Sequence, residues 1–258
     1  MTNQPYTFLG GDARGDAFSF VVEPFSEDFA GSLSWKFFGN QLLRCASLHA
    51  GRRGFGFADM MRHRHVWVLS RLVIDLERMP RTGEAYTIET WVSRVFRQFT
   101  DRQFAITSPD GFNYGFASST WALIDLDSRT SLDLENLPEG SFADITLDKD
   151  TSIGTARRVR LKEAEPIKTY QAGYSDLDIN GHVNSIRYIE TALDLFPVER
   201  FDTQRPARIE ALYTAEAYAG DILLYYMTPA DDNTHLVEIR RQHDGQPVFK
   251  AAIVWKTL

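Results

Sequence analysis

The chain carries the same short pattern twice, and this repeat limits the possible folds more than any other feature. Asp110-Gly111 precedes an apolar run that ends at Trp121, and Asp244-Gly245 precedes one that ends at Trp255. The two copies lie about 134 residues apart at both ends. Asp-Gly between apolar runs rich in aromatic and β-branched residues is typical of a tight hairpin turn. Each copy therefore predicts two antiparallel strands.

A second pair of matching segments lies upstream of the first. Gly83-Glu84 opens the alternating run AYTIETWV, and Gly220-Asp221 opens ILLYYM, about 137 residues further along. Two pairs in the same order at nearly the same separation predict a duplicated unit. The alternative is coincidence among the hairpins of one large sheet.

Each half also contains one predicted helix ahead of these strands. Apolar residues recur at helical spacing over 35–50 and over 183–196, and Pro197 ends the second pattern. The strands predicted from alternation are 18–22, 65–77, 84–94, 100–108, 118–126, 208–216, 222–227, 236–241 and 248–256. The expected fold class is α+β, with residues 1–140 and 167–258 as two domains and the polar segment 141–166 as a linker.

Composition excludes several classes of protein. With 43% hydrophobic and 24% charged residues, the chain is not intrinsically disordered. A net charge of −7 argues against nucleic acid as a partner. No apolar stretch approaches the length of a membrane span. A single cysteine, Cys45, excludes an internal disulfide or a cysteine-based zinc cluster and is expected in the core. The N-terminus shows no secretory signal, so we expect a cytoplasmic protein.

The densest group of polar residues is the run from Asp176 to Asn184, directly before the second predicted helix. Asp, Asn and Ser at such a junction are typical helix caps, which is our interpretation of Asp176, Asn184 and Ser185. His182, flanked by Asp178 and Asn180, is a candidate catalytic residue. The spacing also imitates the start of an EF-hand, but its twelfth position is Arg187 instead of glutamate, which argues against calcium.

Other chemical motifs are weaker. His63 and His65 resemble a metal-binding pair without a third ligand nearby. The sequence has no serine-hydrolase elbow, phosphate-binding loop or dinucleotide fingerprint. Glu216 stands late in a predicted strand, where an acid is less common.

Three segments together resemble the acyl-(acyl-carrier-protein) thioesterases of plant plastids and bacteria. YSDLDINGHVNSIRYIETALDLF (174–196) is similar to the family motif SDxDxNxHVNxxxYI. WVLSRLVIDLERMPRTGEAYTIETWV (67–92) and ASSTWALIDLDSRTSLDL (117–134) resemble family segments in the first half. The resemblance implies a tandem pair of hotdog domains, each a helix wrapped by an antiparallel sheet. It also implies hydrolysis of fatty acyl thioesters on acyl carrier protein, which releases the free fatty acid and ends chain elongation.

The resemblance also implies the catalytic residues, which would be Asp178, Asn180, His182 and Glu216. Water would attack the thioester, with His182 and Glu216 as general bases, Asp178 orienting the imidazole and Asn180 positioning the thioester or the water. Backbone N–H groups at the start of the second helix would stabilise the oxyanion. Plant members carry a cysteine directly after the glutamate, whereas this chain has Ala217, and no metal or organic cofactor is expected.

The partner implied by the resemblance is acyl carrier protein with its phosphopantetheine-linked acyl chain. The acyl chain would enter a slot in the first domain. The expected lining residues are Asn40, Leu43, Ser47, Phe55, Phe57 and Trp67. Because the carrier is acidic, docking requires a basic surface. Candidate basic runs are 52–53, 62–65 and 157–162. The sequence does not distinguish a monomer from a homodimer.

Two other functions fit a hotdog protein that binds acyl thioesters. A hydratase or dehydratase would also use Asp and His at the helix start but would not need Glu216. A non-catalytic acyl-thioester-binding module would lack one of the four polar residues and would typically carry a DNA-binding helix-turn-helix.

Overall fold

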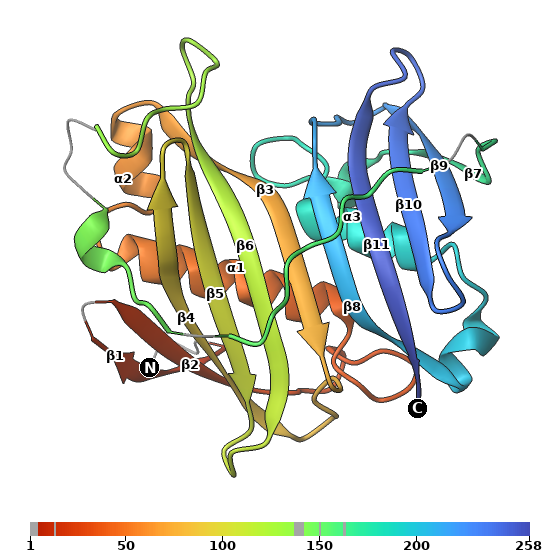
Figure 1. The fold of residues 1–258 in the computed structure, drawn as a ribbon, viewed down its shortest axis with the longest axis horizontal. Coiled ribbons are helices and arrows are strands. Elements are labelled where there is room, and N and C mark those ends of the chain that lie inside the picture. The colour runs from red at the N-terminus through yellow and green to blue at the C-terminus, as the bar shows by residue number, and fades with distance from the viewer. Residues whose placement is uncertain (1–4, 13, 137–141, 150, 162–163) are drawn as a thin grey trace. The chain divides into compact units, whose positions relative to one another are not determined.

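A computed structural model describes residues 5–12, 14–136, 142–149, 151–161 and 164–258 (Figure 1). The chain divides into two compact units. Unit 1 comprises residues 1–70 and 76–153, and unit 2 comprises residues 71–75 and 154–258. The segment predicted as a linker, 141–166, is thus divided between the units after Ile153, and its residues 141, 150, 162 and 163 lie outside the described residues.

Unit 1 is an antiparallel sheet with a long helix across one face (Figure 1). The strand order is β1-β2-β4-β5-β6, followed by β3. The strands are β1 (Thr7–Gly11), β2 (Gly15–Val21), β3 (His65–Leu76), β4 (Ala85–Phe96), β5 (Phe99–Thr107) and β6 (Asn113–Asp125). The helices are α1 (Trp35–Gly51), α2 (Phe57–Arg62) and the 3-10 turn η1 (Ala143–Ile145).

Helix α1 confirms the prediction from hydrophobic spacing. Ser34 is its N-cap and accepts a hydrogen bond from the N–H of Phe37 at 3.4 Å. Phe38, Leu42 and Cys45 lie three or four residues apart and are fully buried, so this face of the helix packs on the sheet.

Unit 2 repeats the arrangement with a shorter helix. Strand order is β8-β11-β10-β9-β7, and residues 71–75 of β3 pair with β8. The strands are β7 (Lys168–Gln171), β8 (Gln204–Tyr213), β9 (Ile222–Pro229), β10 (Thr234–Arg241) and β11 (Pro247–Thr257). The helical elements are η2 (Tyr174–Asp176), α3 (Ser185–Leu193) and η3 (Val198–Asp202). Tyr188 of α3 stacks on Phe249 of β11 with ring centroids 5.4 Å apart, which holds the helix on the sheet.

The glycines of the repeated segments have the same backbone conformation in both halves. Gly111 and Gly245 have φ values of 90° and 68°, and Gly83 and Gly220 have 82° and 86°. These left-handed values favour glycine, which explains why the repeat is visible at these positions. Gly83 lies two residues before the start of β4, and Gly220 lies two residues before the start of β9. The predicted duplication is therefore confirmed in the fold.

The sequence prediction differs from the structure at several boundaries. The strand predicted to run to Glu216 ends at Tyr213, so Glu216 lies in the loop that follows β8. The helix predicted over 183–196 spans only 185–193, with Asn184 as its N-cap and Asp194 as its C-cap. Strands β1 and β7 and helix α2 were not predicted. None of the helices in the described ranges is long and apolar enough to cross a membrane.

Candidate active site

The polar run before α3 forms a tight loop built around one carboxylate. Asp178 Oδ1 accepts hydrogen bonds from the backbone N–H groups of Asn180 at 2.8 Å and His182 at 3.1 Å. Gly181, with a φ of 77°, donates its N–H to the carbonyl of Asp178, and the N–H of Asp178 reaches the carbonyl of His182. Asp178 therefore shapes the loop that presents His182.

This loop is joined to the segment that follows β8. The N–H of Val183 donates to the carbonyl of Ala217 at 2.8 Å, and His182 forms an isolated β-bridge with Tyr218. These contacts bring two segments that are more than 30 residues apart in sequence into register. Glu216 is consequently held next to His182, although it does not lie in a strand.

The side chains of His182 and Glu216 face each other. His182 Nδ1 lies 3.5 Å from Glu216 Oε1, and their side chains are 28% and 39% exposed, so both remain accessible to a substrate. Tyr218 donates its hydroxyl to Glu216 Oε2 at 2.7 Å and sets its ring edge-on to the imidazole, with centroids 5.0 Å apart. Tyr218 could not be predicted from the sequence, because a lone aromatic residue in a loop follows no pattern.

Arg241 on β10 fixes the backbone beneath this group. Its Nη1 donates to the carbonyl oxygen of Glu216 at 2.6 Å, while its Nη2 donates to Asp244 at 2.7 Å. The glutamate is therefore held through its main chain by a residue of the sheet and through its carboxylate by Tyr218.

Unit 1 contains the same loop without the same chemistry. Asp28 Oδ1 accepts from the N–H groups of Ala30 at 2.9 Å and Ser32 at 3.1 Å, and Gly31 has a φ of 74°. The N–H of Leu33 then donates to the carbonyl of Pro80 at 2.8 Å, as Val183 does to Ala217. The repeat thus extends to the loop, where the sequence analysis had not found it.

Matching the two loops bond by bond shows which polar residues the fold itself requires. Asp178 has an equivalent in Asp28, so this aspartate belongs to the loop geometry. The positions of Asn180, His182 and Glu216 are taken in unit 1 by a residue without a comparable group in each case. These are Ala30, Ser32 and Met79. Three of the four candidate catalytic residues are therefore particular to unit 2.

The structure confirms the interpretation of Asn184 as the cap of α3, whereas Asp176 binds the start of the turn η2 and Ser185 is the first residue of α3. Asn184 Oδ1 accepts from the N–H of Ile186 at 2.8 Å. Asp176 is buried, and burial acts to raise the pKa of its carboxyl. Hydrogen bonds from the N–H of Gly173, the hydroxyl of Tyr170 and the guanidinium of Arg187 outweigh that effect and hold the pKa below its usual range.

The structure does not support calcium binding at the EF-hand-like run that begins at Asp176. Arg187 lies 2.7 Å from Asp176, so the residue at the twelfth position is a cation paired with the residue at the first. Within the described parts of the chain, no group of three or more His, Cys, Asp or Glu side chains could hold a metal ion.

The expected acyl-slot residues separate into two groups. Phe55 and Trp67 pack in one apolar cluster with Leu123, and Trp67 Nε1 donates to the carbonyl of Phe55 at 2.9 Å. The other four do not join this cluster. Phe57 is 50% exposed at the start of α2, and Asn40, Leu43 and Ser47 are exposed or half-buried on α1.

Cys45 is not accessible. It is fully buried on α1, as predicted for a core residue, and burial raises the pKa of its thiol well above the usual range. A thiol in that state supplies no thiolate for nucleophilic attack.

Comparison with known proteins gives consistent results along most of the chain. Residues 18–136 match the acyl-ACP thioesterase N-terminal domain, and residues 159–257 match the acyl-ACP thioesterase C-terminal domain. A palmitoyl-acyl carrier protein thioesterase from chloroplasts of Gossypium hirsutum is 25% identical over 228 residues, which are 80% of this chain and 54% of the relative. The chain spans about half the length of the first curated relatives it matches.

Solved structures agree with the fold. An acyl-ACP thioesterase from Bacteroides thetaiotaomicron has 42% sequence identity and a TM-score of 0.87, with 94% of this chain and 98% of that chain covered. A 12:0-ACP thioesterase from Umbellularia californica shares the fold with a TM-score of 0.81 at 17% identity, over 95% of this chain and 94% of that one. The expected hotdog architecture is thereby confirmed.

Proposed function

Because this chain belongs to the acyl-ACP thioesterase family, we propose that it hydrolyses the thioester between a fatty acyl chain and the phosphopantetheine arm of acyl carrier protein. The observation that carries the proposal is the contact of His182 Nδ1 with Glu216 Oε1 at 3.5 Å. The equivalent loop of unit 1 has neither group. A hydrolase of this family has a use for an imidazole paired with a carboxylate, which the duplicated fold does not need.

The geometry favours His182 as the base that activates water. With Nδ1 facing Glu216, the imidazole carries its proton on Nδ1 and leaves Nε2 free to accept one. Nε2 takes a proton from water as the water oxygen bonds to the thioester carbon. When the C–S bond breaks, the same proton passes to the departing sulfur, so the products are a free fatty acid and the thiol of the carrier arm. General base catalysis of this kind contributes roughly 10²–10⁴-fold.

Glu216 then has the orienting role that sequence analysis gave to Asp178. Its carboxylate holds the Nδ1 proton and stabilises the imidazolium during the reaction. Asp178 acts indirectly, because its carboxylate binds the backbone of the loop that carries His182.

Asn180 is the proposed donor to the thioester oxygen. Its backbone N–H is bound by Asp178. The residue is exposed and lies two positions before His182 in the sequence. The N–H groups of Ile186 and Arg187 at the start of α3 are already bound to Asn184. The side-chain amide of Asn180 is therefore a better candidate for stabilising the oxyanion than those two backbone groups.

Direct attack by water, without a cysteine nucleophile, agrees with the location of the single thiol. Ala217 occupies the place next to Glu216 where plant members carry cysteine, and the thiol of Cys45 is buried in unit 1. The acyl slot in unit 1, with Phe55 and Trp67 among its lining residues, remains part of the proposal, as does a cytoplasmic location.

The test is product analysis with acyl carrier protein loaded with saturated acyl chains of several lengths. The proposal predicts free carrier thiol and free fatty acid in equal amounts. Formation of a double bond or of a hydroxyacyl thioester without thiol release would identify a hydratase or dehydratase instead. Binding of the acyl carrier without turnover at any chain length would identify a binding module.

A further inference from the structure

Tyr218 adjoins both members of the proposed catalytic pair, His182 and Glu216. The hydroxyl of Tyr218 donates to Glu216 Oε2 at 2.7 Å, while Glu216 Oε1 faces His182 Nδ1. The two carboxylate oxygens thus have different partners, one on each side. A carboxylate bound at only one oxygen can rotate about its terminal torsion, whereas this one is held at both.

Tyr218 also contacts the imidazole directly. Its ring meets that of His182 at an interplanar angle of 89° with centroids 5.0 Å apart, and the two residues form a β-bridge through their backbones. The N–H of Tyr218 is bound by the carboxylate of Asp221 at 2.9 Å, which fixes the backbone of the tyrosine. One residue therefore restrains both members of the pair.

The duplicated loop shows that the fold does not require a tyrosine here. Arg81 stands at the matching bridge position of unit 1, where it pairs with Ser32 and its N–H is bound by Glu84 at 2.9 Å. The backbone contacts are thus the same in both units. Only unit 2 places a hydroxyl on a glutamate next to a histidine.

We propose that Tyr218 is a positioning residue for the hydrolysis, which orients the Glu216 carboxylate toward His182 Nδ1. The inference depends on the proposed function and adds a fifth residue to its active site. The hydroxyl acts through Glu216 and does not touch the thioester. Its loss should slow the chemical step and leave substrate binding unchanged.

The decisive variant is Tyr218→Phe, which removes the hydroxyl and keeps the ring against His182. We expect kcat to fall about tenfold with KM unchanged, as for a hydrogen bond to a charged group that acts in the transition state. Tyr174→Phe, at a tyrosine that is 95% exposed, is the matched control and should match the wild type.

A double variant separates positioning from a general structural effect. If Tyr218 acts only through Glu216, Tyr218→Phe combined with Glu216→Gln should be no slower than Glu216→Gln alone. An unchanged kcat, a rise in KM in place of the fall in kcat, or rate losses that multiply would overturn the proposal. If the wild type hydrolyses no acyl thioester, the proposed function fails, and the positioning role with it.

An independent observation concerns the three basic runs found in the sequence. Arg52 and Arg53 both contact the buried carboxylate of Asp16, at 3.4 and 2.9 Å. Arg62 pairs with Asp59, and Arg64 binds Asp127 at 2.7 Å. The two arginines of the second run are therefore each paired with a carboxylate, whereas Arg52 and Arg53 share one.

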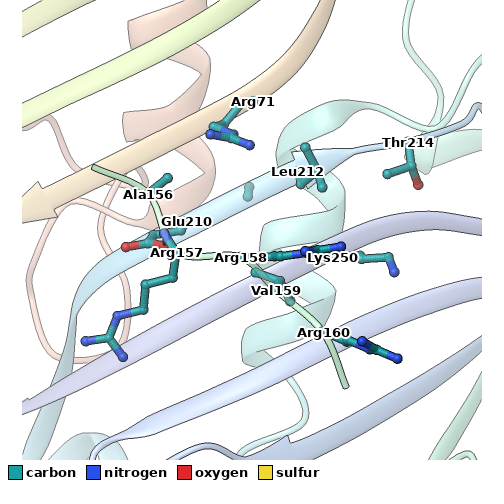
Figure 2. Close-up of a pocket in the computed structure, with 11 residues that line it drawn as sticks. Arg71, Ala156, Arg157, Arg158, Val159, Arg160, Glu210, Leu212, Thr214 and Lys250 are labelled. Atoms are coloured by element: carbon teal, nitrogen blue, oxygen red, sulfur yellow. Dashed lines mark hydrogen bonds between the residues drawn. The ribbon is translucent and has the colours of Figure 1, made fainter. Parts of the chain in front are cut away.

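The third run borders a groove in unit 2. Residues 156–160 cross over the strands that carry Glu210 and Lys250, and the groove between them measures about 520 Å³ (Figure 2). Its lining includes five cationic side chains, from Arg71, Arg157, Arg158, Arg160 and Lys250. Its one carboxylate, Glu210, is buried and already binds Arg208 at 2.6 Å. Lys162, the last residue of the run, lies outside the described residues.

Most of this positive charge is not balanced within the unit. Lys250 pairs with Glu238 at 2.8 Å and Arg157 with Asp231 at 3.5 Å. Among the described residues, Arg71, Arg158 and Arg160 form no ion pair. These three side chains are exposed, so the groove presents a local positive charge in a chain of net charge −7.

We infer that this cationic groove docks the acidic surface of the carrier protein, again on the premise of the proposed function. Charge complementarity supports that occupant, because the chain is otherwise acidic and would repel an acidic partner. Thr214 lines the groove and lies two residues before Glu216 in the same loop. One lining residue of the groove therefore belongs to the loop that carries the proposed catalytic carboxylate.

The test compares Arg158→Gln/Arg160→Gln with the matched pair Arg62→Gln/Arg64→Gln. The groove variant should bind acyl carrier protein about tenfold more weakly in low salt, and the control should bind like the wild type. Hydrolysis of an acyl thioester of N-acetylcysteamine, which has no carrier, should be equal in all three proteins. Unchanged carrier binding by the groove variant, an equal loss in the control, or a loss on the small thioester would each contradict the inference. Because binding is measured directly, the result stands whether or not the proposed hydrolysis is observed.

Discussion

Replacement of Asp178 distinguishes a residue that shapes the loop from a residue that handles charge during catalysis. Asp178 Oδ1 accepts two backbone hydrogen bonds, at 2.8 and 3.1 Å, and Asp28 accepts two of nearly the same length in unit 1. Bonds to a charged acceptor are worth roughly 1.5–3 kcal/mol each. Because this loop is partly exposed, we expect Asp178→Ala and Asp28→Ala each to lower the free energy of unfolding by about 2–3 kcal/mol.

Asp178→Asn is the more informative substitution, since the amide oxygen can still accept both hydrogen bonds. We expect it to cost less than about 1 kcal/mol of stability and to keep kcat within about threefold of the wild type. Asp178→Ala should lose more than about 10²-fold in kcat, because the loop no longer holds His182 against Glu216. Asp28→Ala should leave kcat unchanged at a temperature where it is folded.

Urea denaturation gives the stabilities, and release of free thiol from an acyl thioester gives kcat. An Asp178→Asn variant that is as stable as the wild type yet loses more than about 10²-fold in kcat would contradict this prediction. Such a result would show that the charge of Asp178 acts directly on the imidazole, as the sequence resemblance first implied.

Three further predictions concern residues away from the site. Cys45→Ala should keep most of the hydrolytic activity, because the thiol is fully buried, and complete loss would reopen a thiol mechanism. Asp16→Ala should lower the free energy of unfolding by roughly 3–5 kcal/mol in denaturation experiments, because it leaves the nearly buried guanidinium of Arg53 without its carboxylate; a cost below about 1 kcal/mol would contradict this. Burial lowers the pKa of His49 to about 3, so the native state keeps this imidazole neutral while the unfolded chain protonates it near pH 6.5. The contribution of the neutral imidazole to the free energy of unfolding is complete above pH 6.5 and is lost as the pH falls toward 3. Between pH 7 and 5 the free energy of unfolding should therefore fall by about 2 kcal/mol less in His49→Gln than in the wild type. Parallel pH profiles of the two proteins would disprove this.

Local patterns were sufficient to predict the main elements of the fold. The spacing of Leu42, Leu43, Ala46 and Ala50 predicted α1, because a helix that covers a sheet must bury one face. The Asp-Gly turns predicted the hairpins, since Gly111 and Gly245 adopt conformations that favour glycine. The short strands β1 and β7 escaped notice because four or five residues show too little alternation to be distinguished from a loop.

The candidate site was only partly predictable. His182 was identified from its polar neighbours, but the position of Glu216 depends on contacts between segments, such as that of Val183 with Ala217. The apolar and acidic residues near Glu216 continue the alternation of β8, so the pattern extended the strand too far. The matching loop of unit 1 was invisible in the sequence, because the two copies share only Asp28 and Gly31 with Asp178 and Gly181. Its hydrogen bonds identify it, and those are set by backbone geometry.

The most direct measurement of the central claim is the rate at which acyl carrier protein thiol is released by the wild type, His182→Ala and Glu216→Ala. We predict that both variants fold with unchanged circular dichroism and release thiol at least about 10²-fold more slowly. Wild-type rates in either folded variant would remove that side chain from the mechanism, and wild-type rates in both would show that thioester hydrolysis does not depend on this pair.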